Sequence, residues 1–174
     1  MPERIVPPSL FVIGGARSGK SRYAQQRAEA TGLTPVYIAT AQAWDEEMRL
    51  RIAQHQADRD MSWTTVEAPL LLAEAIATHS APDRVLLVDC LTLWVSNLLL
   101  AEQDIAAVTA GLVEAIARAQ GCVMLVSNEV GLGIVPANAL ARRFRDEAGV
   151  VNQRVAACVE EVQFVAAGLN LKMK

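Results

Sequence analysis

Cysteine and histidine are scarce in this chain of 174 residues. The cysteines, Cys90, Cys122 and Cys158, are odd in number and widely spaced. Neither a disulfide framework nor a zinc site is indicated, and we expect buried free thiols. Only two histidines are present, His55 and His79, so histidine chemistry would depend on very few positions.

Long hydrophobic runs and an excess of positive charge are also absent. The longest apolar stretches, such as residues 85–88 and 98–101, are too short to span a bilayer, and residues 1–8 lack the core of a signal peptide. With 16 Lys and Arg against 19 Asp and Glu, the net charge is −3, and no basic stripe stands out. We therefore expect a cytoplasmic protein with a small substrate, no nucleic-acid partner and no stable membrane insertion. A content of 52% apolar and 20% charged residues predicts one globular domain over residues 1–174.

The most informative motif is GGARSGKS, which has the spacing GxxxxGKS of a phosphate-binding loop. It follows the apolar run 10–13 and precedes a helical pattern over residues 21–31, which is the context that the motif requires. Lys20 is expected to reach the β- and γ-phosphates and Ser21 to bind Mg²⁺, whereas Arg17 either touches phosphate or is a solvated residue at the loop tip. The predicted phosphate-binding residues are Gly14, Gly15, Ala16, Arg17, Ser18, Gly19, Lys20 and Ser21.

Strand-like runs alternate with helical patterns along the rest of the chain. The predicted strands cover residues 10–13, 36–39, 84–89, 122–126 and 162–167. This alternation predicts the α/β class, with a mostly parallel sheet covered by helices on both faces. A last run, 169–172, follows Gly168 closely enough to form an antiparallel edge strand.

Ligands bind such sheets beyond the carboxyl ends of the strands, where several polar residues are expected to gather. Asp89 closes a buried strand in the manner of a Walker B acid, so it would hold Mg²⁺ opposite Ser21. The alternative is that Asp89 caps the helix that follows it.

A helical pattern over residues 45–59 contains His55. This histidine follows Met48 by seven residues and Ile52 by three, so it shares their face, and Arg51 and Arg59 flank it at a spacing of four. An unprotonated imidazole between guanidinium groups can attack phosphorus. On spacing alone, a packed structural histidine is the more frequent case.

Two further segments carry candidate contacts. The loop 128–136, Asn-Glu-Val-Gly-Leu-Gly-Ile-Val-Pro, exposes apolar residues that we expect to meet substrate, and Glu129 is a possible metal or hydroxyl partner; a plain turn is the alternative. The arginines at 142, 143 and 145 would reach substrate, pair across a subunit boundary, or form a solvated face.

With these residues in view, the sequence resembles the bifunctional adenosylcobinamide kinase and adenosylcobinamide-phosphate guanylyltransferase family of cobalamin biosynthesis. The resemblance covers nearly the whole chain. Its more specific parts are NEVGLGIVP and FRDEAGVVNQ. The matching segments are GGARSGKSRYA at 14–24, YIATAQ at 37–42, DEEMRLRIAQHQADR at 45–59, NEVGLGIVP at 128–136 and RRFRDEAGVVNQRVA at 142–156.

The resemblance implies a P-loop NTPase fold of the RecA-like type and two reactions at one nucleotide site. The family phosphorylates adenosylcobinamide with ATP or GTP, then transfers GMP from GTP to adenosylcobinamide phosphate through a guanylyl-histidine, which maps onto His55. It also implies Mg²⁺ and a homotrimer. The further nucleotide contacts that it places on this chain are Ile38, Ala39, Thr40, Gln56, Ala57, Asp58, Arg59, Glu67 and Asp89.

Two other functions compete with this one. A simple P-loop kinase for a metabolite would need no histidine nucleophile. A regulatory GTP-binding protein would need an NKxD motif after a strand, but the strand ending at Val126 is followed by Ser-Asn-Glu-Val.

Overall fold

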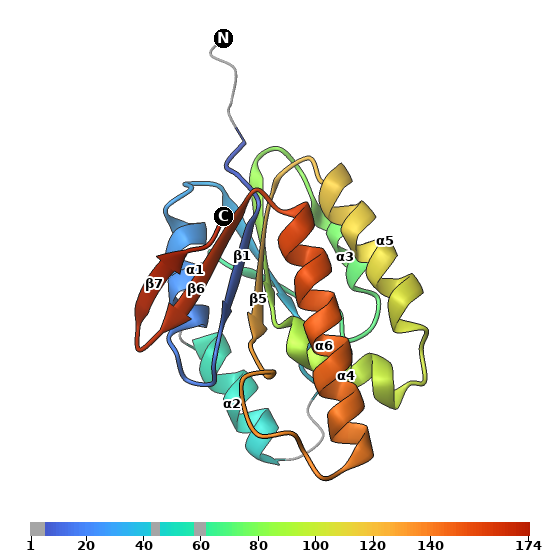
Figure 1. Ribbon diagram of the computed structural model, residues 1–174. Helices are drawn as coiled ribbons and strands as arrows, with labels where there is room; N and C mark the ends of the chain where they lie inside the picture. The colour runs from blue at the N-terminus through green and yellow to red at the C-terminus, as the bar shows by residue number, and fades with distance from the viewer. Residues whose placement is uncertain (1–5, 43–45, 58–61) are drawn as a thin grey trace.

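Strands and helices alternate along the chain, as the sequence predicts (Figure 1). The computed structural model describes residues 6–42, 46–57 and 62–174, apart from the side chains of residues 51, 55 and 56. The elements, in chain order, are β1 (Leu10–Gly14), α1 (Lys20–Glu29), β2 (Thr34–Ala39), α2 (Glu46–Ala57), β3 (Thr64–Glu67), α3 (Leu72–His79), β4 (Arg84–Asp89), α4 (Leu91–Leu100), α5 (Ile105–Arg118), β5 (Cys122–Asn128), α6 (Ala139–Cys158), β6 (Glu161–Ala166) and β7 (Leu169–Lys172).

The strands form one sheet in the order β3-β2-β4-β5-β1-β6-β7. All neighbouring pairs are parallel except β6 with β7, so the predicted antiparallel edge strand is confirmed. Strand β1, the first in sequence, lies between β5 and β6, which are late in sequence. The edge strand β3 was not predicted, because it is short and lacks an apolar run. Val66 is its one aliphatic residue, and the other three residues are exposed.

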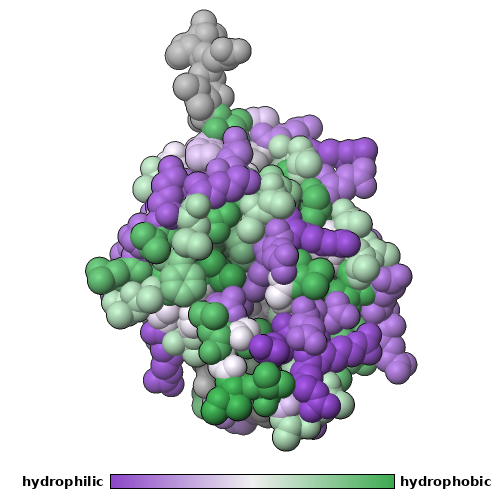
Figure 2. Space-filling view, viewed as in Figure 1, coloured by the Kyte–Doolittle hydropathy of each residue, from purple (hydrophilic) through white to green (hydrophobic). Residues whose placement is uncertain are grey.

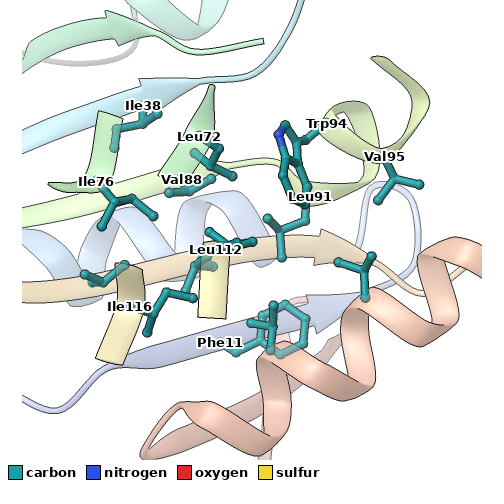
Figure 3. Packing of buried hydrophobic residues seen from close by; sticks show 14 of the residues in the cluster. Phe11, Ile38, Leu72, Ile76, Val88, Leu91, Trp94, Val95, Leu112 and Ile116 are labelled. Carbon is teal, nitrogen blue, oxygen red and sulfur yellow. The ribbon is translucent and has the colours of Figure 1, made fainter. Parts of the chain in front are cut away.

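Helices pack on both faces of the sheet, which confirms the predicted layers. On one face, α3, α4, α5 and α6 enclose a cluster that includes Phe11, Ile38, Val88, Trp94 and Leu112 (Figure 3). On the other face, α1 contributes alanines to a smaller cluster with alternate residues of the same strands. Because successive side chains of a strand point to opposite faces, the apolar runs of β1, β4 and β5 fill both clusters at once.

The carboxyl ends of the parallel strands face helix α2 and the loop between β5 and α6 (Figure 1). That loop exposes large apolar side chains: Leu132 is 84% exposed and Ile134 is 97% exposed. Figure 2 shows a hydrophobic patch in the same region. Within the described ranges, no helix is both long enough and apolar enough to cross a membrane.

Candidate active site

The GGARSGKS segment forms a tight loop between β1 and α1. Gly19 directly precedes the helix with φ of 95°, a left-handed conformation that glycine adopts at little cost. A side chain at Gly14 would collide with the carbonyl oxygen of Val165 on β6. The two glycines therefore allow backbone N–H groups and the start of α1 to face one point, which is the arrangement that binds phosphate.

Lys20 is drawn into this loop. Its side chain is only 9% exposed, and Nζ donates a 3.0 Å hydrogen bond to the carbonyl oxygen of Gly15. Burial lowers the pKa of Lys20, whereas the nearby Asp89 and Cys90 raise it. A partly desolvated ammonium group placed in this way is ready to exchange its backbone partner for phosphate oxygens.

A cavity of about 660 Å³ opens beside the loop and joins it to neighbouring strands and to α2. Its volume lies in the range of sites for small molecules and cofactors. The structure brings most of the predicted phosphate loop to this cavity together with Ala39 and Asp89. The lining residues are Ala16, Arg17, Ser18, Gly19, Lys20, Ser21, Arg22, Tyr37, Ala39, Ala41, Met48, Ile52, Asp89, Cys90, Leu93 and Asn128.

Asp89 is the last residue of β4 and lines the cavity, as does Ser21. The N-cap of α4 is Cys90, and no side chain caps that helix end, so Asp89 does not serve as the helix cap. A carboxylate and a hydroxyl fit Mg²⁺, which keeps several waters and needs few protein ligands besides substrate phosphates. Accordingly, the described part of the chain contains no cluster of three acidic, histidine or cysteine ligands.

Thr40 connects two strand ends. Its hydroxyl accepts a 2.9 Å hydrogen bond from the amide of Cys90 and donates one of 2.7 Å to the Cys90 carbonyl. Asn97 of α4 donates to the Thr40 carbonyl at 2.8 Å. Thr40 is fully buried, so its side chain positions the backbone next to Asp89.

The remaining predicted contacts lie in other places. Ile38 is fully buried in the core cluster beneath α3, α4, α5 and α6, away from the cavity lining, because alternate strand residues point to opposite faces. Glu67 is exposed at the end of the edge strand β3, and Gly15 contacts Lys20 through its carbonyl. Asp58 and Arg59 lie outside the described residues. These nucleotide contacts stay predictions.

Helix α2 brings Met48 and Ile52 to the cavity wall. Both belong to the face that the sequence assigned to the histidine. His55 follows Ile52 in the same helix, and its side chain, like that of Gln56, lies outside the part of the chain that the structure describes. Ala57 ends the helix and is exposed. The cavity therefore adjoins the helix that carries the predicted nucleophile.

Two of the three arginines at positions 142, 143 and 145 of α6 support the β5–α6 loop. Arg145 donates to the carbonyl of Gly131 at 3.2 Å, and Arg142 donates to the carbonyls of Pro136 and Ala137 at 3.0 and 2.6 Å. Arg143 is exposed. Sequence spacing did not predict these loop contacts, because backbone carbonyls as partners leave no trace in the sequence.

Similarity to known proteins agrees with this geometry. Residues 10–173 match the family described as cobinamide kinase / cobinamide phosphate guanyltransferase, designated CobU. The chain is 48% identical to the bifunctional adenosylcobalamin biosynthesis protein CobP of Pseudomonas aeruginosa, over 94% of this chain and 96% of the relative. It is 43% identical to the bifunctional adenosylcobalamin biosynthesis protein CobU of Salmonella typhimurium, over 95% of this chain and 99% of the relative.

Solved structures of more distant proteins share the fold. The flagellar accessory protein FlaH of Methanocaldococcus jannaschii superposes with a TM-score of 0.54 at 14% identity, covering 97% of this chain and 80% of that one. The ATPase EscN of the type III secretion system of enteropathogenic E. coli superposes with a TM-score of 0.52 at 11% identity, covering 92% and 43%. These likenesses support the predicted P-loop NTPase fold and carry no further conclusion about activity.

Proposed function

Because this chain belongs to the cobinamide kinase / cobinamide phosphate guanyltransferase family, we propose that the cavity beside the phosphate loop serves two successive transfers from a nucleotide. The chain is a bifunctional enzyme of adenosylcobalamin biosynthesis. First, the γ-phosphoryl group of ATP or GTP passes to the terminal hydroxyl of adenosylcobinamide. Then GMP passes from GTP to that phosphate, which gives adenosylcobinamide-GDP and pyrophosphate. The observation that carries this proposal is a phosphate loop and helix α2 lining the same cavity.

In the kinase reaction, the loop amides and Lys20 hold the β- and γ-phosphates. Phosphoryl transfer is catalysed mainly by positioning and by neutralising charge, so a buried cation and convergent N–H groups supply most of what the step needs. Bound Mg²⁺, held by Ser21 and Asp89, would neutralise further charge on the phosphates. Burial of Lys20 strengthens its attraction for phosphate, because water no longer screens it.

In the guanylyl transfer, the same contacts hold the departing pyrophosphate and His55 attacks the α-phosphorus. A bond forms between an imidazole nitrogen of His55 and the α-phosphorus, while the bond from that phosphorus to the α–β bridging oxygen breaks. The phosphate of the acceptor then displaces the histidine. Helix α2 has its Met48 and Ile52 at the cavity wall, so the proposed nucleophile is on the element that adjoins the phosphates.

The test is incubation with GTP labelled at the α-phosphorus. A phosphoramidate is stable in base and labile in acid, so we expect label on the protein with that stability. His55→Asn should abolish the labelling, and His79→Asn is the matched control, because His79 ends α3 and does not line the cavity. Absence of label on the unaltered protein, with phosphorylation of adenosylcobinamide retained, would contradict the transfer step and favour a simple kinase.

The proposed assembly is a homotrimer, as the family resemblance implies. Sedimentation equilibrium over a range of protein concentrations measures the molecular mass directly. A mass three times that of the 18.7 kDa chain is expected, and a monomer at all concentrations would contradict the assembly without affecting the two reactions.

A further inference from the structure

Asn128 is the last residue of β5 and lines the phosphate cavity. Its side-chain oxygen Oδ1 is buried and has no hydrogen-bond partner. Among the described cavity-lining residues, Ser18 Oγ shares this condition, and Ser18 belongs to the phosphate loop itself. A buried acceptor without a donor costs roughly 1–3 kcal/mol, so a group kept in this state at a site calls for a ligand.

The backbone around Asn128 is held from several sides. Its amide donates to the hydroxyl of Thr92 at 2.7 Å, and its carbonyl accepts from Nδ2 of Asn152 at 3.3 Å. The next amide, that of Glu129, donates to the carbonyl of Gly14 at 2.9 Å. Every backbone group is thus occupied while the side-chain oxygen is left over. The position is fixed before substrate arrives, which is what a positioning residue requires.

The register of the sheet places Asn128 next to the phosphates. Asn128 is the partner of Gly14, the first glycine of the phosphate loop, on the neighbouring strand. Asp89 is the partner of Val126, so Asn128 lies two residues farther toward the carboxyl edge than the acid on β4. Asn128 and Asp89 therefore stand at different levels on adjacent strands that face one cavity.

The chemistry of the orphan oxygen indicates what it binds. A carbonyl oxygen accepts hydrogen bonds, and phosphate oxygens are themselves acceptors, so they do not satisfy it. Lys20 and the loop amides would supply the donors that the phosphates need, so Asn128 is not required for that purpose. The donor that must lie beside a γ-phosphate in a kinase is the hydroxyl of the acceptor substrate.

We propose that Asn128 positions the acceptor hydroxyl for phosphoryl transfer, an inference that rests on the kinase activity proposed above. The hydroxyl donates a hydrogen bond to Asn128 Oδ1. This hydrogen bond orients the hydroxyl so that a lone pair of its oxygen points at the γ-phosphorus. The new bond joins that oxygen to phosphorus as the bond from phosphorus to the β–γ bridging oxygen breaks. The nucleoside diphosphate leaves, and the hydroxyl proton passes to an oxygen of the transferred phosphoryl group and from there to water. Asn128 accepts no proton.

The structure favours Asn128 over its neighbour for this role. Glu129, which the sequence suggested as a hydroxyl partner, accepts a hydrogen bond from the amide of Gly131 within its own loop. Glu129 is also absent from the lining of the cavity. Its carboxylate is therefore occupied in shaping the loop, and the role passes to the residue before it.

The two reactions of one enzyme supply the test. Formation of the guanylyl-enzyme from GTP needs no acceptor hydroxyl, whereas the kinase reaction does. We expect Asn128→Ala and the nearly isosteric Asn128→Leu to lower kcat/KM for adenosylcobinamide by about tenfold to hundredfold, the worth of one buried hydrogen bond. Labelling of the enzyme by α-labelled GTP should stay within about twofold of the unaltered protein, a margin below the effect of one hydrogen bond. Asn128→Leu should also melt no lower than the unaltered protein, because it removes an unsatisfied buried oxygen.

Asn138→Ala is the matched control. Asn138 caps α6 by accepting from the amide of Ala141, is exposed, and does not line the cavity. It should lose some stability and keep both activities. Equal loss of kinase and guanylylation in the Asn128 variants would assign Asn128 to the nucleotide and overturn the inference. An active Asn128→Leu kinase would overturn it as well. Absence of both reactions in the unaltered protein would instead contradict the proposed function.

Discussion

The amide of Gly168 donates a 2.7 Å hydrogen bond to the carbonyl of Ser18, so the turn between β6 and β7 holds the phosphate loop from the side. Gly168 has φ of 76°. A Cβ atom at Gly19 would lie only 3.2 Å from the Cα of Gly168. Residues near the two ends of the described chain thus shape one loop. Loss of the Gly168–Ser18 hydrogen bond should therefore lower the affinity for nucleotide.

Gly168→Pro should weaken nucleotide binding by about tenfold or more, because proline has no N–H for Ser18 and its φ is fixed near −65°. Gly168→Asn is the matched control, since asparagine keeps the N–H and tolerates the left-handed region. Titration calorimetry with GTP measures both affinities. Equal affinities in the two variants would show that the Gly168–Ser18 bond does not support the loop.

Lys20→Met should abolish nucleotide binding and yet raise the stability of the nucleotide-free protein. Burial lowers the pKa of Lys20, so its folded pKa lies below its unfolded value. The unfolded state then binds the proton more tightly, and the charged lysine opposes folding at neutral pH; this cost fades as the pH rises toward the unfolded pKa. Denaturant unfolding at pH 7 measures the difference. A less stable Lys20→Met protein would contradict this account.

The ion pair between Arg27 of α1 and Glu161 of β6 should make stability depend on acidic pH. Two hydrogen bonds of 2.8 and 2.9 Å join them, and Arg27 lowers the pKa of Glu161 from 4.5 to about 2. A folded pKa below the unfolded value means that the stabilisation is complete above pH 4.5 and is lost as the pH falls through about 2. The melting temperature followed between pH 6 and about pH 2 tests this.

Glu161→Gln should flatten that acid dependence. Glu114→Gln is the control, because Glu114 pairs with Arg118 on an exposed helix surface, where such pairs contribute about 0–1 kcal/mol. The control should keep the acid dependence of the unaltered protein. Parallel curves for the unaltered protein and Glu161→Gln would exclude this pair as the source.

Thr40→Val should lower the free energy of unfolding by about 1–3 kcal/mol, because it leaves the buried amide of Cys90 without its acceptor. It also removes one of two donors to the Cys90 carbonyl, which keeps the amide of Trp94 at 3.3 Å. Valine keeps the shape of threonine, so the loss reports hydrogen bonding. Thr78→Val, on the exposed side of α3, should change stability by less than about 0.5 kcal/mol. Urea unfolding compares the two, and a similar small change in both would show that Thr40 is dispensable.

The sequence predicted the parts of the fold that depend on local patterns. The apolar runs of β1, β4 and β5 are buried on both faces, so their residues reveal the strands without any knowledge of partners. Strand β3 has no such run; it is held by pairing with β2, a contact with residues far away in the sequence. Strand order itself also depends on distant pairing, and it came from the structure.

The candidate site was predictable where a motif imposes chemistry, as with Lys20 and Asp89, which line the same cavity. Nucleotide contacts were less predictable where the only information was that a residue lies at or just after the end of a strand. Ile38 and Thr40 flank Ala39, but Ile38 enters the core and Thr40 binds the Cys90 backbone, because strand alternation and a backbone partner decide their directions. That Asn128 Oδ1 is buried without a hydrogen-bond partner is evident only from the three-dimensional structure.

The central position of β1 has a consequence for synthesis on the ribosome. Strand β1 is made first, but it pairs with β5 and β6, and its loop is completed by the turn at Gly168. Pairings over such sequence separations form slowly and late. The proposed nucleotide site is therefore complete only when the chain has been made as far as that turn, and a bound nucleotide would stabilise only such protein. Nucleotide supply in the cell would act on the completed product and leave unfinished chains unprotected.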